Sequence, residues 1–91
     1  MNKKQRIKLY KEKERLENAH DIIESVRETL EEMYGEEQDK YDNLPEGLQE
    51  SEMGEKLEEI AGLLEDASYD LDSISGEISD VLEKIDEVID M

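Results

Sequence analysis

The single histidine of the chain, His20, follows Glu17 by three residues in the segment Glu17-Asn18-Ala19-His20. Helical-bundle proteins with carboxylate-bridged metals take two ligands from adjacent turns with this Glu-x-x-His spacing. Such a centre also needs an inward-facing carboxylate from each of two further helices, and the apolar side of the other predicted helix offers none. We therefore expect no metal at His20 and interpret it as a half-exposed histidine flanking the core.

Calcium binding and catalysis lack essential groups. Asp70 and Asp72 have the opening spacing of an EF-hand loop, but the next ligand position is the apolar Ile74. With one histidine and no cysteine, the serines have no obvious basic partner for nucleophilic or acid-base chemistry. We expect no catalytic residue, no cofactor and no metal site, and hence a protein that is not an enzyme.

Carboxylates gather on the C-terminal half in two adjoining rows. These rows are positions b and c of a seven-residue repeat, a to g, in which Leu57 is at position a. The two rows contain Glu58, Glu59, Glu65, Asp66, Asp72, Asp80, Asp86 and Glu87. One helical row repeats about every 10 Å and adjacent rows lie roughly 5 to 6 Å apart, a spacing comparable to that of phosphates along a nucleic acid strand. We expect both rows to face outward, either as a solvated face or as a nucleic-acid mimic that fits a basic protein cleft.

The most outward row of the same segment, row f, reads Gly62, Tyr69 and Gly76. Each glycine costs a helix about 1 kcal/mol relative to alanine, so two glycines beside an exposed tyrosine suggest a docking patch. The predicted partner-binding residues are Glu58, Gly62, Glu65, Asp66, Tyr69, Asp72 and Gly76.

An apolar residue recurs along the C-terminal segment with an unbroken spacing of four and three. The residues are Met53, Leu57, Ile60, Leu64, Ala67, Leu71, Ile74, Ile78, Val81, Ile85 and Val88. This 3.5-residue period is typical of a coiled coil, with the row that begins at Leu57 at position a and the row that begins at Met53 at position d. The residues predicted to carry self-association are Leu57, Ile60, Leu64, Leu71, Ile74, Ile78, Val81 and Ile85.

The N-terminal segment carries the same rhythm. Row a contains Leu9, Leu16, Ile23 and Leu30, and row d contains Ala19, Val26 and Met33. Ile22 and Tyr34 widen this stripe on either side, which suits a bundle with more than one neighbouring helix. We predict a helix over residues 3–42, with a possible weak point at Gly35.

Helix breakers concentrate in residues 43–51. Asn43 and Glu46 have the spacing of a capping box, Pro45 suits a first helical turn, and Ser51 can cap a second helix over residues 52–90. Two helices of nearly equal length joined by a short loop form an antiparallel hairpin. Position e of the second helix begins with small residues, Gly54, Ala61, Ser68 and Ser75, where helices can approach closely.

These observations predict an all-α fold with a single domain over residues 1–91. Two helices leave much of the apolar stripe in water, and leucine at a with β-branched residues at d favours four-stranded assemblies. We therefore expect the hairpin to form a homodimer, an elongated four-helix bundle.

The chain of 91 residues has a net charge of −17 and no cysteine. Residues 1–15 hold seven basic and two acidic side chains, a balance of +5, so the remainder carries −22. Such a negative surface repels nucleic acids and anionic membranes. We expect no signal peptide and no membrane span, and the absence of cysteine favours a reducing cytosol.

The segment Tyr41-Asp42-Asn43-Leu44-Pro45-Glu46-Gly47-Leu48-Gln49-Glu50-Ser51-Glu52, with the following Gly54-Glu55 and Leu57-Glu58-Glu59, resembles a family of small acidic proteins of phages and prophages of low-GC Gram-positive bacteria. The resemblance implies the cytoplasm of an infected or lysogenic host and supplies no mechanism. It favours an inhibitor or adaptor of a basic host protein, such as a DNA-handling or defence enzyme. The alternative is a structural coiled-coil homo-oligomer or a phage assembly component.

Overall fold

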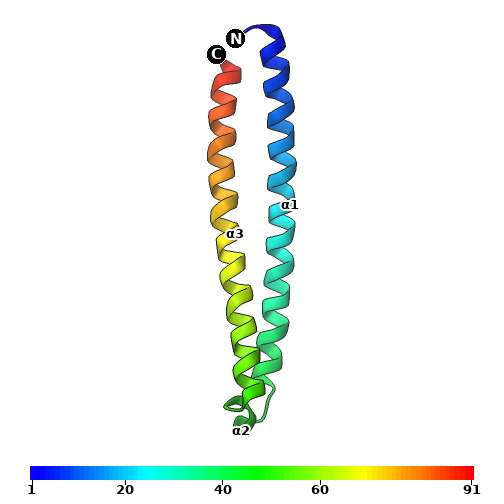
Figure 1. Ribbon diagram of the computed structural model, residues 1–91, viewed down its shortest axis with the longest axis vertical. Helices are drawn as coiled ribbons and strands as arrows, with labels where there is room; N and C mark the ends of the chain where they lie inside the picture. The colour runs from blue at the N-terminus through cyan, green and yellow to red at the C-terminus, as the bar shows by residue number, and fades with distance from the viewer.

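The computed structural model describes all 91 residues as two long antiparallel helices, α1 (Lys3–Asp42) and α3 (Glu52–Asp90), joined through the short helix α2 (Glu46–Gln49). Both termini lie at one end of the rod and α2 lies at the other (Figure 1). The Cα atoms extend over 69 × 15 × 15 Å. The predicted all-α architecture of two long helices packed as a hairpin is confirmed.

Helix α1 begins with a cap that the sequence reading overlooked. Asn2 Oδ1 accepts from the Gln5 amide at 2.8 Å, and Gln5 Oε1 accepts from the Asn2 amide at 3.2 Å, so the two residues form a capping box. The helix runs unbroken through Gly35 to its end. Asn43 caps this C-terminus, where its amide donates to the Asp39 carbonyl at 3.0 Å. Its predicted role as the N-cap of the next turn is therefore wrong.

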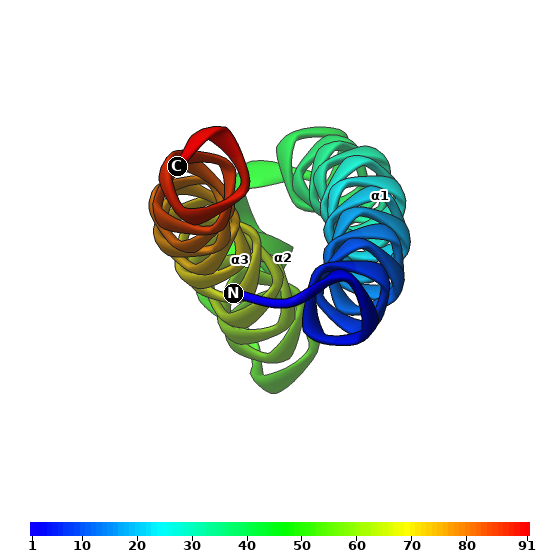
Figure 2. The same cartoon turned by 90° about the horizontal axis from the view of Figure 1, so that it is seen from above.

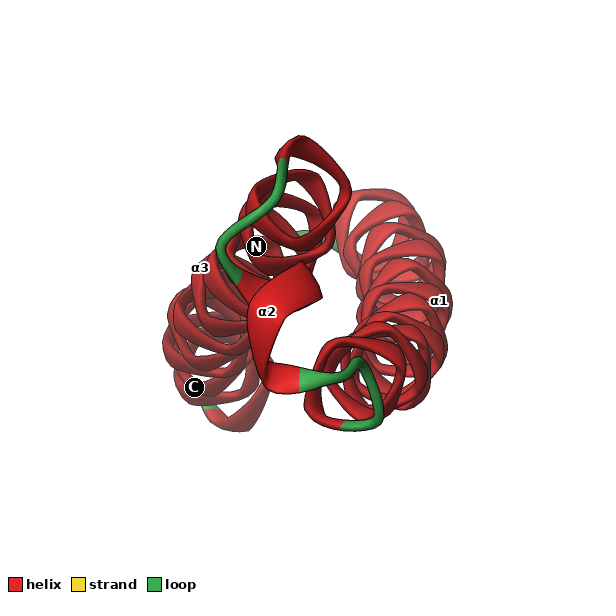
Figure 3. Ribbon diagram, turned by 90° about the horizontal axis from the view of Figure 1, so that it is seen from below, coloured by secondary structure: helices red, strands yellow, loops and turns green.

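The connection contains one helical turn. Pro45 precedes α2, with no side chain capping this turn, and Ser51 caps α3 by accepting from the Gly54 amide at 3.3 Å. Figure 3 shows α2 at the closed end between the end of α1 and the start of α3. Gln49 ties the turn to α1 by donating to the Tyr41 carbonyl at 3.3 Å.

Helix α3 meets this turn so closely that only a glycine fits at position 54. A Cβ added at Gly54 would lie 2.2 Å from the carbonyl oxygen of Gln49 and 2.6 Å from that of Leu48. Both obstructing atoms belong to the backbone and cannot rotate away. The absence of a side chain at Gly54 therefore lets the connection pack against the start of α3.

The helices contact each other through rows a and e, whereas the apolar repeat predicted rows a and d. All four fully buried residues belong to row e of α3: Gly54, Ala61, Ser68 and Ser75. Row a of α3 is half-buried beside them and consists of Leu57, Leu64, Leu71, Ile78 and Ile85. Seen from above, both helices sweep sideways along their length, as supercoiled helices do (Figure 2).

The helices contact through rows a and e for one steric and one polar reason. Small side chains at row e let the backbones approach, and α1 offers long polar side chains that reach across the narrow contact. Row d is left uncovered on both helices. Neither long helix contains a stretch that is long and apolar enough to cross a membrane.

Candidate functional site

One edge of the helix contact is a ladder of polar pairs that repeats every seven residues. Row e of α1 supplies Arg6, Lys13, His20, Arg27, Tyr34 and Tyr41. Row b of α3 faces five of these residues with Asp86, Ser79, Asp72, Glu65 and Glu58. We call this edge the polar ladder.

The ladder is basic towards the open end of the hairpin, where both termini lie, and phenolic towards α2. Lys13 Nζ lies 2.6 Å from Asp86 Oδ1, and Arg27 Nε lies 3.9 Å from Asp72 Oδ1. Arg6 donates to the Ile89 carbonyl at 2.8 Å and so ties the two ends of the chain together. This charge pattern makes the antiparallel pairing specific, since a parallel pairing would lose all of these contacts.

Ionisation along the ladder follows from its partners. The hydrogen bond to Asp86, together with the charge of that carboxylate, raises the pKa of Lys13. The Glu65 carboxylate raises the pKa of the Tyr34 phenol through a hydrogen bond and through its charge. The pKa of Tyr41 is raised by burial first, then by the charge of Glu58. All of these groups therefore keep their protons at neutral pH.

The ladder corrects the prediction that rows b and c of α3 both face outward. Row b borders α1, so Glu65 is half-buried and Asp72 lies near a guanidinium. Glu58, although exposed, lies beside the Tyr41 phenol. Row c, to which Asp66 belongs, remains exposed. Of the two carboxylate rows that were predicted to face outward, only row c does so fully, whereas row b makes contacts with α1.

A second polar cluster crosses the middle of the contact. Ser75 is only 3% exposed, and its hydroxyl lies 2.9 Å from His20 Nε2. The same hydroxyl donates to Glu24 Oε1, and Arg27 also binds the Glu24 carboxylate, at 2.7 Å. The Ser75 hydroxyl, followed by the guanidinium, lowers the pKa of Glu24. The sequence reading missed Ser75 and Glu24 because their residue types mark no site until α3 is paired with α1.

This cluster is built for packing. A nucleophilic serine needs access to substrate and a histidine free to take its proton, whereas the Ser75 proton goes to Glu24 and no hollow opens beside it. Glu17, which has the Glu-x-x-His spacing with His20, is exposed. No group of three or more potential metal-ligating side chains is present.

The opposite edge of the contact is apolar and uncovered. Rows b and d flank an a/e contact on opposite sides of each helix, and in an antiparallel pair the two d rows emerge on the same side. The residues there form what we call the apolar face: Ala19, Val26, Met33, Ile60, Ala67, Ile74, Val81 and Val88. Its six larger members are 37% to 45% exposed.

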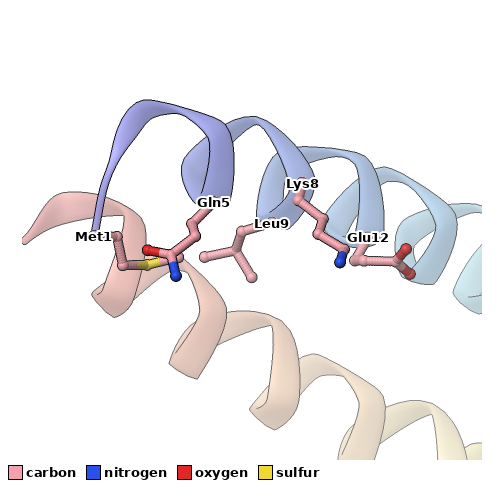
Figure 4. Close-up of a pocket in the computed structure, with 5 residues that line it drawn as sticks. All are labelled: Met1, Gln5, Lys8, Leu9 and Glu12. Atoms are coloured by element: carbon pink, nitrogen blue, oxygen red, sulfur yellow. The ribbon is translucent and has the colours of Figure 1, made fainter.

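At the open end the apolar face continues into a shallow groove of about 420 Å³. Met1, which precedes α1, lines it together with Gln5, Lys8, Leu9 and Glu12 from the start of α1, as the sticks in Figure 4 show. A second hollow follows it along the same edge, between Ala19 of α1 and Ile85 of α3. Both hollows border row d, so the uncovered side of the hairpin is both grooved and apolar.

The predicted self-association residues thus separate into two groups. Leu57, Leu64, Leu71, Ile78 and Ile85 are half-buried within the hairpin. Ile60, Ile74 and Val81 belong to the exposed apolar face. Row a is therefore used within the hairpin, and of the two rows predicted to carry self-association only row d is left exposed.

The predicted docking patch lies apart from both edges. Tyr69 is 64% exposed, and a Cβ added at Gly62 or Gly76 would meet no atom within 4 Å. This surface is open, and the neighbouring row c gives it a negative charge.

Comparison with known proteins finds no matching family model, no matching curated protein and no matching solved structure.

Proposed function

We propose that the chain is a non-enzymatic protein-interaction module that acts as a homodimer, with the apolar face of each hairpin buried against the other. The observation that carries the proposal is the exposure of this face, where Val26 and Ile74 remain 45% and 42% exposed. A contiguous apolar stripe along a rod is typical of a protein interface. Burying it would produce the elongated four-helix bundle predicted from the heptads.

Sedimentation equilibrium at micromolar concentration tests this proposal. We expect a mass of twice 10.6 kDa for the native chain. The double variant Val26→Glu, Ile74→Glu should be monomeric yet helical, because a charge within an apolar interface must be desolvated without a partner. Ile7→Glu is the matched control, since Ile7 is 48% exposed but lies at row f, away from the apolar face. A native monomer at these concentrations would refute the dimer.

A second activity is proposed for the outside of this rod. The exposed Tyr69, the open positions at Gly62 and Gly76 and the carboxylates of row c together suit a basic protein partner. Charge complementarity of this kind increases association rates, whereas an aromatic anchor increases residence time. The resemblance to small acidic phage proteins favours an inhibitor or adaptor of a host protein, with a nucleic-acid mimic as one form; a structural phage assembly component is the alternative.

Affinity capture from a bacterial lysate distinguishes these two functions. An inhibitor that mimics nucleic acid should retain a DNA-handling enzyme that duplex DNA displaces, whereas an assembly component should retain virion proteins. With a purified partner, neutralising Glu59, Asp66, Asp80 and Glu87 should slow association and flatten its salt dependence. Tyr69→Ala should instead accelerate dissociation. Unchanged rates in both variants would exclude this surface as the contact.

A further inference from the structure

We infer that the second copy packs on the apolar face in an antiparallel orientation, with a two-fold axis at the level of Val26 and Ile74. This inference rests on the proposed homodimer and adds its orientation and register. The ladder contacts, such as Lys13 with Asp86 and His20 with Ser79, fix the level of each residue within the hairpin. They bring Val26 of row d on α1 level with Ile74 of row d on α3.

The first argument is the match of side chains across this axis. With Val26 opposite itself, Ala19 faces Met33 of the second copy, so a small residue meets a large one. On α3, with Ile74 opposite itself, the small Ala67 meets the larger Val81, and Ile60 meets Val88, two β-branched residues. The two d rows would thus interdigitate along the central part of the rod.

The second argument is the match of charges beyond the apolar stretch. Row d of α1 continues with Glu12 towards the open end and with Lys40 towards α2. The antiparallel axis brings Glu12 of one copy opposite Lys40 of the other. It also brings Arg15 beside Glu36, one row further out. The two-fold axis generates each of these ion pairs twice.

A parallel dimer would lose these ion pairs. Its α1 would pack against α3 of the second copy, with Glu12 set against Val88 and Lys40 set against Ile60. Arg15 would then lie beside Lys84, a pair of like charges. Charged side chains would be buried against apolar ones without a partner, which is strongly unfavourable.

The third argument is the distribution of net charge along the rod. The ladder contacts place residues 1–23 beside residues 76–91. The first segment holds seven basic and four acidic side chains, and the second holds one basic and six acidic. The open end therefore carries a net charge of only −2, and −15 of the total of −17 resides in residues 24–75. A parallel dimer would superpose the two negative ends, whereas the antiparallel dimer places each next to a nearly neutral end.

Disulfide trapping tests the orientation, since the chain has no cysteine of its own. Val26→Cys and Ile74→Cys, each tested alone under mild oxidation, should form a covalent dimer, because each residue meets its own copy at a distance a disulfide can span. Glu28→Cys, at the outward row f, is the control that should stay monomeric on a denaturing gel.

The outcomes separate this inference from the proposed function. If light scattering shows a dimer but only a mixture of the Val26→Cys and Ile74→Cys chains cross-links, the dimer is parallel and the inference is wrong. A dimer in which neither variant cross-links, alone or mixed, overturns the register as well. A monomer by light scattering refutes the homodimer itself.

Spin labels provide a readout that does not perturb the interface. Gly47 lies at the α2 end, and a side chain there meets no atom within 4 Å, so Gly47→Cys should accept a nitroxide without disturbing the fold. The antiparallel dimer places the two labels at opposite ends, with a separation approaching the 69 Å length of the rod. A separation of roughly 20 Å, about two helix spacings, would show a parallel dimer and overturn the inference.

Discussion

At the scale of single residues, the glycines show how strongly the surroundings decide the effect of one atom. Gly54 is enclosed by the Gln49 and Leu48 carbonyls, whereas Gly62 projects into open space on the same helix. Neither has a positive φ, so backbone conformation does not require either glycine. Only the close approach of α2 does so, and only at Gly54.

Gly54→Ala and Gly62→Ala should therefore change stability in opposite directions. The first inserts a methyl group 2.2 Å from a backbone oxygen, so the connection must move and the free energy of unfolding should fall. The second should stabilise α3 by up to about 1 kcal/mol, because alanine is the better helix former. Urea denaturation followed by circular dichroism measures both, and a Gly54→Ala chain as stable as the native one would disprove the close contact.

The buried hydroxyl of Ser75 should control the ionisation of Glu24. Because its donation lowers the pKa of Glu24, Ser75→Ala should shift the pKa of that carboxyl back towards its ordinary value of 4.5. A lowered carboxyl pKa adds stability that is complete above pH 4.5 and is lost as the pH falls through the lowered pKa. The Ser75→Ala chain should accordingly lose less stability than the native chain on acidification.

Carbon-detected NMR titration of the Glu24 carboxyl in both chains measures the shift directly. If the pKa of Glu24 is the same with and without the hydroxyl, the hydrogen bond from Ser75 does not govern it.

At the scale of helices, the sequence determines the hairpin more clearly than the pairing of its rows. Heptad rhythm and the breakers in residues 43–51 were sufficient to predict two long helices and an antiparallel turn. They could not decide whether row d or row e completes the contact, because row a belongs to both possible seams. The small residues Ala61, Ser68 and Ser75 are visible in the sequence. What the pattern on α3 does not indicate is that His20 and Arg27 of α1 span the gap, which is a tertiary property.

The same reasoning explains which part of the candidate surface could be predicted. Row c and Tyr69 are outward in any pairing that uses row a, so their exposure followed from periodicity. Row b would face outward if the contact used rows a and d, as predicted, but it borders α1 because the contact uses rows a and e. Glu65 then became a partner of Tyr34, a contact that no local pattern on either helix indicates.

Ser68→Leu tests the role of the small row. Ser68 is 4% exposed between the helices, so a leucine there should force them apart and destabilise the hairpin by about 1 to 3 kcal/mol. Ser73→Leu is the matched control, because Ser73 belongs to the exposed row c and its change should stay within about 0.5 kcal/mol. Equal denaturation midpoints for the two variants would place the contact elsewhere.

At the scale of the whole molecule, attraction and repulsion between charges occupy different parts of the rod. The open end pairs Lys13 with Asp86 and Arg6 with the Ile89 carbonyl, and its net charge over residues 1–23 and 76–91 is only −2. Towards α2, acidic side chains outnumber basic ones on both helices. Exposed pairs contribute only about 0.2 to 1 kcal/mol each, so the repulsion among unpaired carboxylates should dominate the response to salt.

The melting temperature should therefore rise between low and moderate salt, because screening weakens the repulsion within a chain of net charge −17. Neutralising Glu55, Glu59 and Asp66 to Gln or Asn should make this rise shallower, since the three side chains are exposed in the most negative part of the rod. Lys13→Met tests the opposite change. Because it removes a cation, the melting temperature should rise more steeply with salt. Thermal melts at a series of NaCl concentrations measure all three slopes, and a native melting temperature that falls as salt is added would mean that the ion pairs of the open end outweigh the repulsion.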